Sequence, residues 1–95
     1  MSYLIIYTMK GCTFCGTFKK RIDEEGINFI ERDIDKFENE YNLFKKIVKN
    51  SLVPAFLIVN DKMNDIHAFA PQRDYNTIEE AVEIIKLNLS SDKAD

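Results

Sequence analysis

The order of apolar and polar positions along the chain predicts alternating strands and helices. Short apolar runs at residues 3–7 and 55–59 are typical of buried strands, and the second is so uniformly apolar that we expect it to be central in a sheet. A loosely alternating segment, residues 27–34, and a weaker apolar run, residues 66–70, predict two more strands. The polar residues 60–64 predict the turn between the last two strands.

The first predicted helix covers residues 12–25. Phe14, Phe18 and Ile22 recur there at the spacing of one helical face and predict an apolar stripe. Gly26, directly after this segment, suits a helix C-cap.

Two further segments predict helices. Asp35 is a suitable N-cap for a helix over residues 36–49. Thr77 and Glu80 form the T-x-x-E pattern of a capping box and open a last helix that runs to about residue 89. The apolar faces of these two helices are Tyr41, Phe44, Ile47 and Val48, and Ile78, Ala81, Val82, Ile85 and Leu89.

The elements follow one another in the order β-α-β-α-β-β-α. Short connections and right-handed crossovers then predict an α/β fold, with a four-stranded mixed sheet flanked by three helices that cover both faces. The 95 residues suit a single domain, residues 1–95, with a frayed polar tail at residues 90–95.

Charge and composition exclude several classes of protein. The chain has 13 basic and 16 acidic residues and a net charge of −3, which disfavours a nucleic-acid-binding protein. No stretch approaches the roughly 20 apolar residues of a membrane span, and residues 1–8 lack the basic start of a signal peptide. We therefore expect a cytoplasmic monomer that binds neither nucleic acid nor membrane.

The two cysteines are the candidate chemical groups. Cys12 and Cys15 are so close in sequence that a bridge between them adds little folding stability. They lie where the first strand meets the first helix, and the N–H groups and dipole of a helix N-terminus stabilise a thiolate. Lys10 adds positive charge nearby. This predicts a redox pair in which Cys12 is the nucleophile, and Cys15, one turn further in and more buried, resolves the mixed disulfide.

Half of a zinc site is the alternative for such a C-x-x-C pair. Zinc needs about four ligands, and the chain has no further cysteine and a single histidine, His67. A C-x-x-C pair in a βαβ context therefore favours redox chemistry over zinc binding.

The combined features resemble a dithiol glutaredoxin of the thioredoxin superfamily over nearly the whole chain. The resemblance rests on the first strand followed by Cys-Thr-Phe-Cys, on Val53-Pro54 before a strand, and on the capped last helix. It implies a thioredoxin-like fold in which a cis Pro54 faces the cysteines and the Val53 backbone hydrogen-bonds glutathione or an extended peptide. It also implies that Lys10 meets the glycyl carboxylate of glutathione and that Phe14 lines the same groove. Glutathione would be the reducing co-substrate of a protein that holds no bound cofactor.

Two stretches depart from the family's pattern. The usual C-P-Y-C is C-T-F-C here. Residues 69–77 also lack the Gly-Gly pair that glutaredoxins place before the last helix, followed by an aspartate that holds the γ-glutamyl end of glutathione. Asp74, Asn76 and Thr77 are candidate substitutes for this contact, and the alternative is that they only cap the helix.

The resulting hypothesis is an oxidoreductase that reduces protein disulfides or glutathione mixed disulfides and is recycled by glutathione. Its partners would be glutathione and a disulfide-bearing protein. The missing Gly-Gly pair leaves open a thioredoxin-like hydrogen donor that a flavoprotein reductase recycles. A glutaredoxin that binds a [2Fe–2S] cluster between two protomers is less favoured, because most such proteins have Ser at the position of Cys15.

Overall fold

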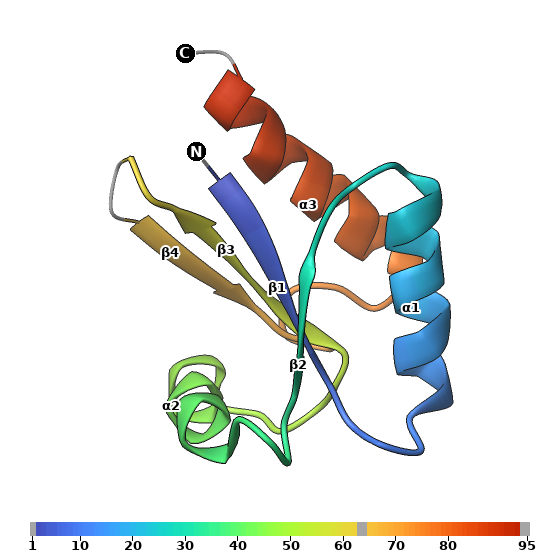
Figure 1. The fold of residues 1–95 in the computed structure, drawn as a ribbon, viewed down its shortest axis with the longest axis vertical. Helices are drawn as coiled ribbons and strands as arrows, with labels where there is room; N and C mark the ends of the chain where they lie inside the picture. The colour runs from blue at the N-terminus through green and yellow to red at the C-terminus, as the bar shows by residue number, and fades with distance from the viewer. Residues whose placement is uncertain (1, 63–64, 94–95) are drawn as a thin grey trace.

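The computed structural model describes residues 2–62 and 65–93. The elements, in chain order, are β1 (Ser2–Thr8), α1 (Thr13–Glu24), β2 (Ile30–Asp33), α2 (Glu38–Val48), β3 (Ala55–Asn60), β4 (Asp65–Phe69) and α3 (Ile78–Lys93) (Figure 1). This is the predicted β-α-β-α-β-β-α order. Within the described ranges, no helix is long and apolar enough to cross a bilayer.

The strands form one mixed sheet in the order β2-β1-β3-β4. β1 pairs in parallel with β2 and antiparallel with β3, where Tyr7 lies opposite Ala55. β4 pairs antiparallel with the other side of β3. β3 is therefore central, as its uniformly apolar run predicts.

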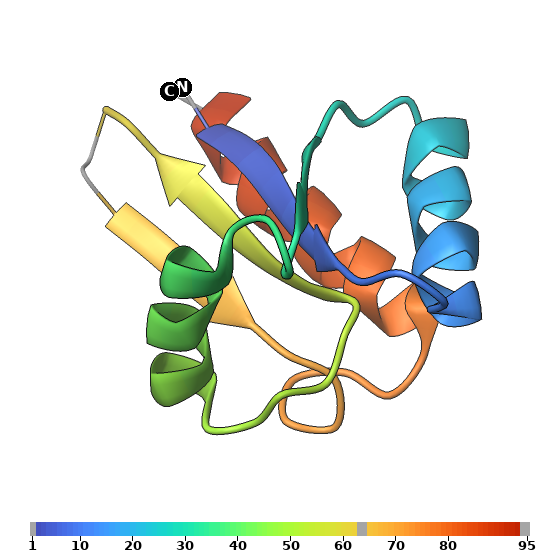
Figure 2. The same cartoon turned by 60° about the horizontal axis from the view of Figure 1, so that its bottom comes forward.

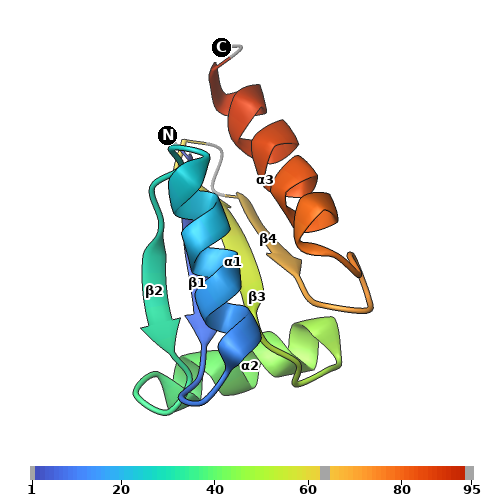
Figure 3. The same cartoon turned by 90° about the vertical axis from the view of Figure 1, so that its right-hand side faces the viewer.

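The helices divide between the two faces of the sheet. α1 and α3 lie together on one face, and α2 lies alone on the other, near the ends of the strands (Figures 1 and 3). Successive β1 side chains point to opposite faces and so enter two different apolar clusters. The principal members are Leu4, Ile6, Phe18, Phe56 and Ile85 on the first face, and Ile5, Tyr7, Tyr41, Phe44 and Val48 on the second. The result is the expected thioredoxin-like arrangement.

β2 is shorter and α3 is longer than the sequence pattern indicates. β2 begins at Ile30 rather than at residue 27, because the Ile27 N–H still donates to the Ile22 carbonyl at 3.2 Å and closes the end of α1. α3 continues to Lys93, past the predicted helix end at about residue 89. Residues 94 and 95 lie outside the described residues.

The start of α2 also differs from its prediction. The helix begins directly after Phe37, whose side chain makes no capping hydrogen bond. Asp35 is therefore not the N-cap. The chain turns after β2 instead, and the Asp33 carboxylate accepts from the Asp35 N–H at 2.8 Å, which delays the helix.

The buried face of α2 is narrower than predicted. Tyr41, Phe44 and Val48 are buried, whereas Ile47, which was assigned to the same face, is 61% exposed. One turn earlier, Leu43 is 64% exposed. α2 therefore presents apolar side chains to solvent as well as to the core.

The start of α3 is the predicted capping box. The Glu80 N–H donates to the Thr77 hydroxyl at 3.1 Å, and the Thr77 N–H donates back to the Glu80 carboxylate at 3.0 Å. The Asn76 N–H donates to the same carboxylate at 2.9 Å. These backbone donors favour the charged form and hold the pKa of Glu80 below its ordinary value.

We expect Glu80→Gln to lower stability near neutral pH and to reduce its acid dependence. The pKa of Glu80 is lower in the folded chain than in the unfolded chain. Its charge therefore contributes stability that is present above the ordinary value of 4.5 and is lost as the pH falls through the lowered pKa. The urea midpoints of the wild type and the variant should differ most at about pH 7 and converge towards about pH 3.

The matched control is Glu79→Gln, which makes the same charge change one residue away, outside the capping box. It should leave the wild-type pH dependence in place. Equal effects from the two substitutions would contradict the stabilising role assigned to the Glu80 carboxylate.

Candidate functional site

Cys12 and Cys15 lie at the start of α1, directly after the loop that follows β1 (Figure 3). Cys12 is the N-cap and has an extended backbone, and Thr13 is the first helical residue. A disulfide joins the two cysteines, whose Cα atoms are 5.3 Å apart. The Cys15 N–H donates to the Cys12 sulfur at 3.1 Å, so a backbone donor at the start of the helix points at that sulfur.

The two sulfurs differ in exposure. Cys12 is half-buried, whereas Cys15 is 2% exposed and lies on the buried side of α1 with Phe18 and Ile22. The first turn of α1 has no acidic residue, so no carboxylate there opposes a negative charge on Cys12. Cys12 is thus the more exposed of the two cysteines.

Phe14 does not belong to the buried stripe that the sequence predicts for α1. Its side chain is 51% exposed, while Phe18 and Ile22 are fully buried. The buried stripe instead starts at Cys15, one residue later. Phe14 is left at the surface beside the two cysteines.

The loop before β3 is fixed by a contact from a distant part of the chain. The Val53–Pro54 peptide bond is cis, as the family resemblance implies. Tyr75, which is 4% exposed, donates its hydroxyl to the Pro54 carbonyl. Burial, reinforced by the nearby Asp74 carboxylate, raises the pKa of Tyr75, so the hydroxyl stays protonated and remains a donor.

A groove of about 180 Å³ lies between this loop, the loop before α3 and the start of α1. It is lined by Phe14, Val53, Pro54, Pro71, Gln72, Tyr75, Asn76 and Thr77. The Asn50 amide donates to the Pro71 carbonyl at 3.1 Å, which holds the two loops side by side (Figure 2). The groove therefore brings together Phe14, Val53 and Pro54, three of the residues singled out from the sequence.

Lys10 and Asp74 are not among the residues that line the groove. Lys10 is exposed in the turn before Cys12. One oxygen of the Asp74 carboxylate already accepts from the Ala70 N–H at 2.9 Å and from the Arg73 guanidinium at 2.7 Å. Asp74 therefore organises its own loop, and only its other oxygen remains for a ligand.

The loop before α3 holds two residues that were not singled out from the sequence, Gln72 and Tyr75. Gln72 has a φ of 68°, a left-handed backbone that favours glycine, and its N–H donates to the Tyr75 carbonyl at 2.8 Å, which closes the turn. One signal was available for Tyr75, because it is the single aromatic residue between positions 71 and 77. Its partner, the Pro54 carbonyl, is too distant in sequence to be inferred.

Comparison with protein families agrees with this geometry. The family model described as Glutaredoxin matches residues 4–63, a range that contains both cysteines, Val53 and Pro54. The chain belongs to the glutaredoxin family. None of the curated proteins compared with the chain matches it.

A solved structure with a similar fold is maleylacetoacetate isomerase from Anaeromyxobacter dehalogenans 2CP-1, with dicarboxyethyl glutathione and citrate bound in its active site. The TM-score is 0.57 and the sequence identity is 15%. The match covers 92% of this glutaredoxin and 37% of the isomerase, so the chain spans well under half of that protein. At this identity, the likeness supports the fold alone.

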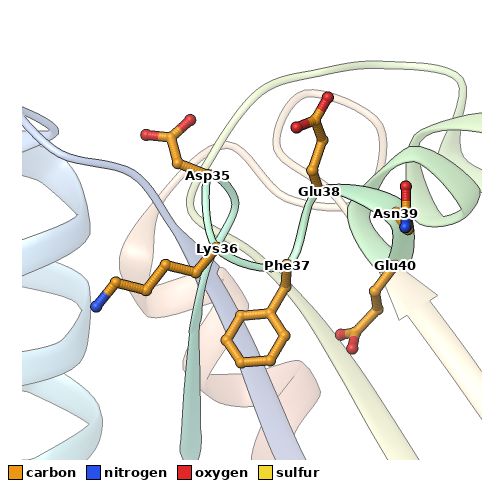
Figure 4. A pocket seen from close by; sticks show the side chains of 6 residues that line it. All are labelled: Asp35, Lys36, Phe37, Glu38, Asn39 and Glu40. Atoms are coloured by element: carbon orange, nitrogen blue, oxygen red, sulfur yellow. The ribbon is translucent and has the colours of Figure 1, made fainter.

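A larger hollow, of about 430 Å³, lies at the start of α2 and is lined by residues 35–40. The Phe37 ring and the Glu40 carboxylate point to the same side there (Figure 4). Both are engaged by Arg32, which donates to Glu40 at 3.0 Å and lies 4.5 Å from the centre of the Phe37 ring. This hollow contains neither cysteine of the glutaredoxin pair. Among the described residues, no group of three or more His, Cys, Asp or Glu side chains is arranged to hold a metal ion.

We expect Tyr75→Phe to lower the free energy of unfolding by about 1–3 kcal/mol, because it removes the hydroxyl donor from a buried carbonyl. Unfolding in guanidinium chloride measures the change. The control is Tyr3→Phe, which removes the hydroxyl of a tyrosine that is 37% exposed. This control should cost less than about 0.5 kcal/mol. Equal losses in the two variants would show that the Tyr75 hydroxyl does not stabilise the Pro54 loop.

Proposed function

We propose that this glutaredoxin reduces protein disulfides and mixed disulfides between proteins and glutathione, through the dithiol form of Cys12 and Cys15. The proposal rests on one observation, the position of Cys12. Its sulfur is partly exposed at the N-cap of α1 and receives a helix N–H, and the groove lined by Phe14 and Pro54 begins two residues away. The helix terminus stabilises the attacking thiolate, and the groove positions the chain that carries the substrate sulfur.

Reduction begins when the Cys12 thiolate attacks one sulfur of the substrate disulfide. A bond forms between Cys12 and that sulfur, and the other substrate sulfur leaves as a thiolate, which takes a proton from solvent. Cys15 then loses its proton to solvent and attacks the Cys12 sulfur. The second substrate sulfur leaves, and the Cys12–Cys15 disulfide closes. Two electrons have passed from the enzyme to the substrate.

Two glutathione molecules return these electrons. The first attacks the Cys12 sulfur, which gives a mixed disulfide on Cys12 and frees Cys15 as a thiol. The second attacks that mixed disulfide, which restores the Cys12 thiolate and releases oxidised glutathione. No bound cofactor takes part in this sequence.

Glutathione would lie along the groove with its cysteinyl unit on the Val53 backbone and its glycyl carboxylate towards Lys10. The glutathione derivative in the isomerase of similar fold supports this class of ligand. The γ-glutamyl end of glutathione has the fewest available hydrogen-bond partners. The N–H groups of Asn76 and Thr77 already donate to the Glu80 carboxylate, and Asp74 has one oxygen left. We therefore propose weak glutathione binding.

We further propose that the protein acts as a monomer in a reducing compartment such as the cytoplasm. Every group in the reaction sequence comes from one chain. A reducing glutathione pool would keep the C-x-x-C pair in the dithiol form that attacks substrates.

A thioredoxin-like hydrogen donor, recycled by a flavoprotein reductase, is the second candidate. The internal use of Asp74 favours it, together with the absence of a Gly-Gly pair before α3. Both candidates use the same cysteines and differ in the source of electrons. The choice between them is therefore a question about the reductant.

We expect Cys12→Ser to abolish reduction of every disulfide substrate, because the attacking sulfur is lost. Cys15→Ser should accumulate mixed disulfides with protein substrates and still turn over small glutathione adducts, because a second glutathione can attack Cys12 in place of Cys15. Non-reducing electrophoresis detects the trapped species, and an NADPH-coupled assay measures turnover.

In the reduced wild type, iodoacetamide should label Cys12 before Cys15 near neutral pH. Equal labelling rates would contradict the assigned roles.

We expect turnover with glutathione and glutathione reductase to exceed turnover with thioredoxin reductase. Asp74→Ala should lower the glutathione-dependent rate by roughly tenfold to a hundredfold, the usual cost of one charged anchor. Insulin reduction driven by dithiothreitol should be spared. Arg73→Ala, which removes the guanidinium that donates to Asp74 and to the Ala68 carbonyl but keeps the Asp74 carboxylate, is the control. Unchanged glutathione kinetics in Asp74→Ala would exclude Asp74 from the glutathione site, and faster turnover with thioredoxin reductase would favour the second candidate.

A further inference from the structure

α2 has two well-exposed apolar side chains on the side that does not pack on the sheet. Leu43 is 64% exposed and Ile47 is 61% exposed, and their spacing of one helical turn places them side by side. Leu52, in the loop that follows the helix, is 41% exposed. Together they extend an apolar strip from α2 towards the loop before β3.

The charged residues of positions 41–60, which carry this strip, are all basic, and Glu40, one turn before Leu43, is already paired with Arg32. Residues 41–60 contain Lys45, Lys46 and Lys49 and no aspartate or glutamate, in a chain whose net charge is −3. Lys45 lies over the Tyr41 ring at 5.6 Å, whereas Lys46 and Lys49 are exposed. Among the side chains that the structure describes, those of residues 2–62 and 65–89, no carboxylate forms an ion pair with Lys46 or Lys49. The strip is therefore bordered by positive charge that nothing in the described chain neutralises.

The strip continues into the candidate active site. The loop that carries Lys49 and Leu52 ends at Val53 and Pro54, which form one wall of the groove. The Asn50 amide fixes this loop to the Pro71 carbonyl at 3.1 Å, so the strip and the groove are held in one arrangement. In Figure 2 the same loop runs from the end of α2 along the edge of the sheet where α1 begins.

We propose that the α2 surface docks the part of a protein substrate that flanks its reducible cysteine, and that this part carries apolar side chains bordered by carboxylates. The α2 surface consists of Leu43, Lys46, Ile47, Lys49 and Leu52. The proposal rests on the disulfide-reducing function proposed above and names its preferred class of substrate. Apolar contact supplies the attachment, and the two lysines select and steer the acidic segment.

Other occupants fit the α2 surface less well. A second copy that docked through the same surface would bring Lys46 and Lys49 towards their own copies, and like charges would face each other across a two-fold axis. Another strongly exposed apolar residue, Ile66, lies beside the acidic Asp65 at the start of β4, the end of that strand farther from the groove loops. The α2 surface is thus distinguished by the combination of apolar exposure, one sign of charge and continuity with the groove.

The test uses two synthetic peptides, each with a single cysteine glutathionylated. In one peptide the cysteine is flanked by leucines and glutamates, and in the other lysines replace the glutamates. The mixed disulfide of glutathione with 2-mercaptoethanol is the small substrate. We expect the wild type to have a higher kcat/KM for the acidic peptide than for the basic one. The double variant Lys46→Glu, Lys49→Glu should lower kcat/KM for the acidic peptide by about fivefold for each lysine reversed. Leu43→Ser with Ile47→Ser should lower kcat/KM for both peptides, and neither pair of changes should alter turnover of the small substrate.

The matched control combines Lys20→Glu on α1 with Ile66→Ser on β4, the same two kinds of change at exposed positions away from the α2 surface. It should leave the preference between the peptides unchanged. The proposal would be overturned if the wild type reduced the acidic and the basic peptide with equal kcat/KM. It would also be overturned if the control variant lost as much kcat/KM for the acidic peptide as the variants of the α2 surface do. A dimer in sedimentation that Leu43→Ser with Ile47→Ser abolishes would overturn it too, because the surface would then bind a second copy.

Binding of the acidic peptide, with its cysteine alkylated, separates this proposal from the proposed function. The alkylated peptide has no disulfide, so its binding depends on docking alone. Absence of turnover with all three substrates would refute the reducing function. The proposed docking at the α2 surface would still be supported if the alkylated acidic peptide bound more tightly than the alkylated basic peptide. It would be refuted if the two peptides bound equally.

Discussion

The antiparallel pairing of β1 with β3 is the constraint on which the site depends. Tyr7, near the end of β1, lies opposite Ala55, at the start of β3. The chain that leaves β1 towards Cys12 and the chain that arrives from Val53 and Pro54 therefore meet at one edge of the sheet. A slip of one residue in this pairing would turn the β3 side chains to the opposite faces, which the two separate apolar clusters strongly disfavour. Packing of the core thus sets the register, and the register sets where the groove lies.

Local sequence signals predicted the parts of this molecule that depend on neighbouring residues. The C-x-x-C pair, the T-x-x-E box of α3 and the apolar run of β3 each lie within a few residues, and each was found in its predicted place. The predictions that Asp35 caps α2 and that Ile47 is buried were wrong, because contacts outside these local patterns decide both positions. The turn organised by Asp33 displaced the first, and the small area of α2 that meets the sheet left the second exposed. Tyr75 could not be assigned from the sequence, because its function as a donor depends on a carbonyl 21 positions away.

Directional polar bonds, in addition to the apolar packing of Tyr75 and Val53, hold the walls of the groove. The Asn50 amide and the Tyr75 hydroxyl each cross from one loop to the other, and the Asp74 carboxylate and the Gln72 N–H close the second loop on itself. Such bonds depend on geometry more steeply than burial does. The conformation of each loop is therefore specified by a few named contacts.

The turn at Gln72 shows how the groove can change in the course of evolution. The left-handed backbone of Gln72 is held by a hydrogen bond from its N–H to the Tyr75 carbonyl, so the turn forms without a glycine. Gln72 and Asn76, which line the groove on this side, are exposed and lie outside the two cores, whereas Tyr75 belongs to the first core; all three lie far in sequence from Cys12. Selection can therefore alter which molecules the groove admits, by exchanging side chains in one turn, while the nucleophile and the fold are inherited unchanged. Such separation would let a protein with this fold change the molecules that it binds without a new domain.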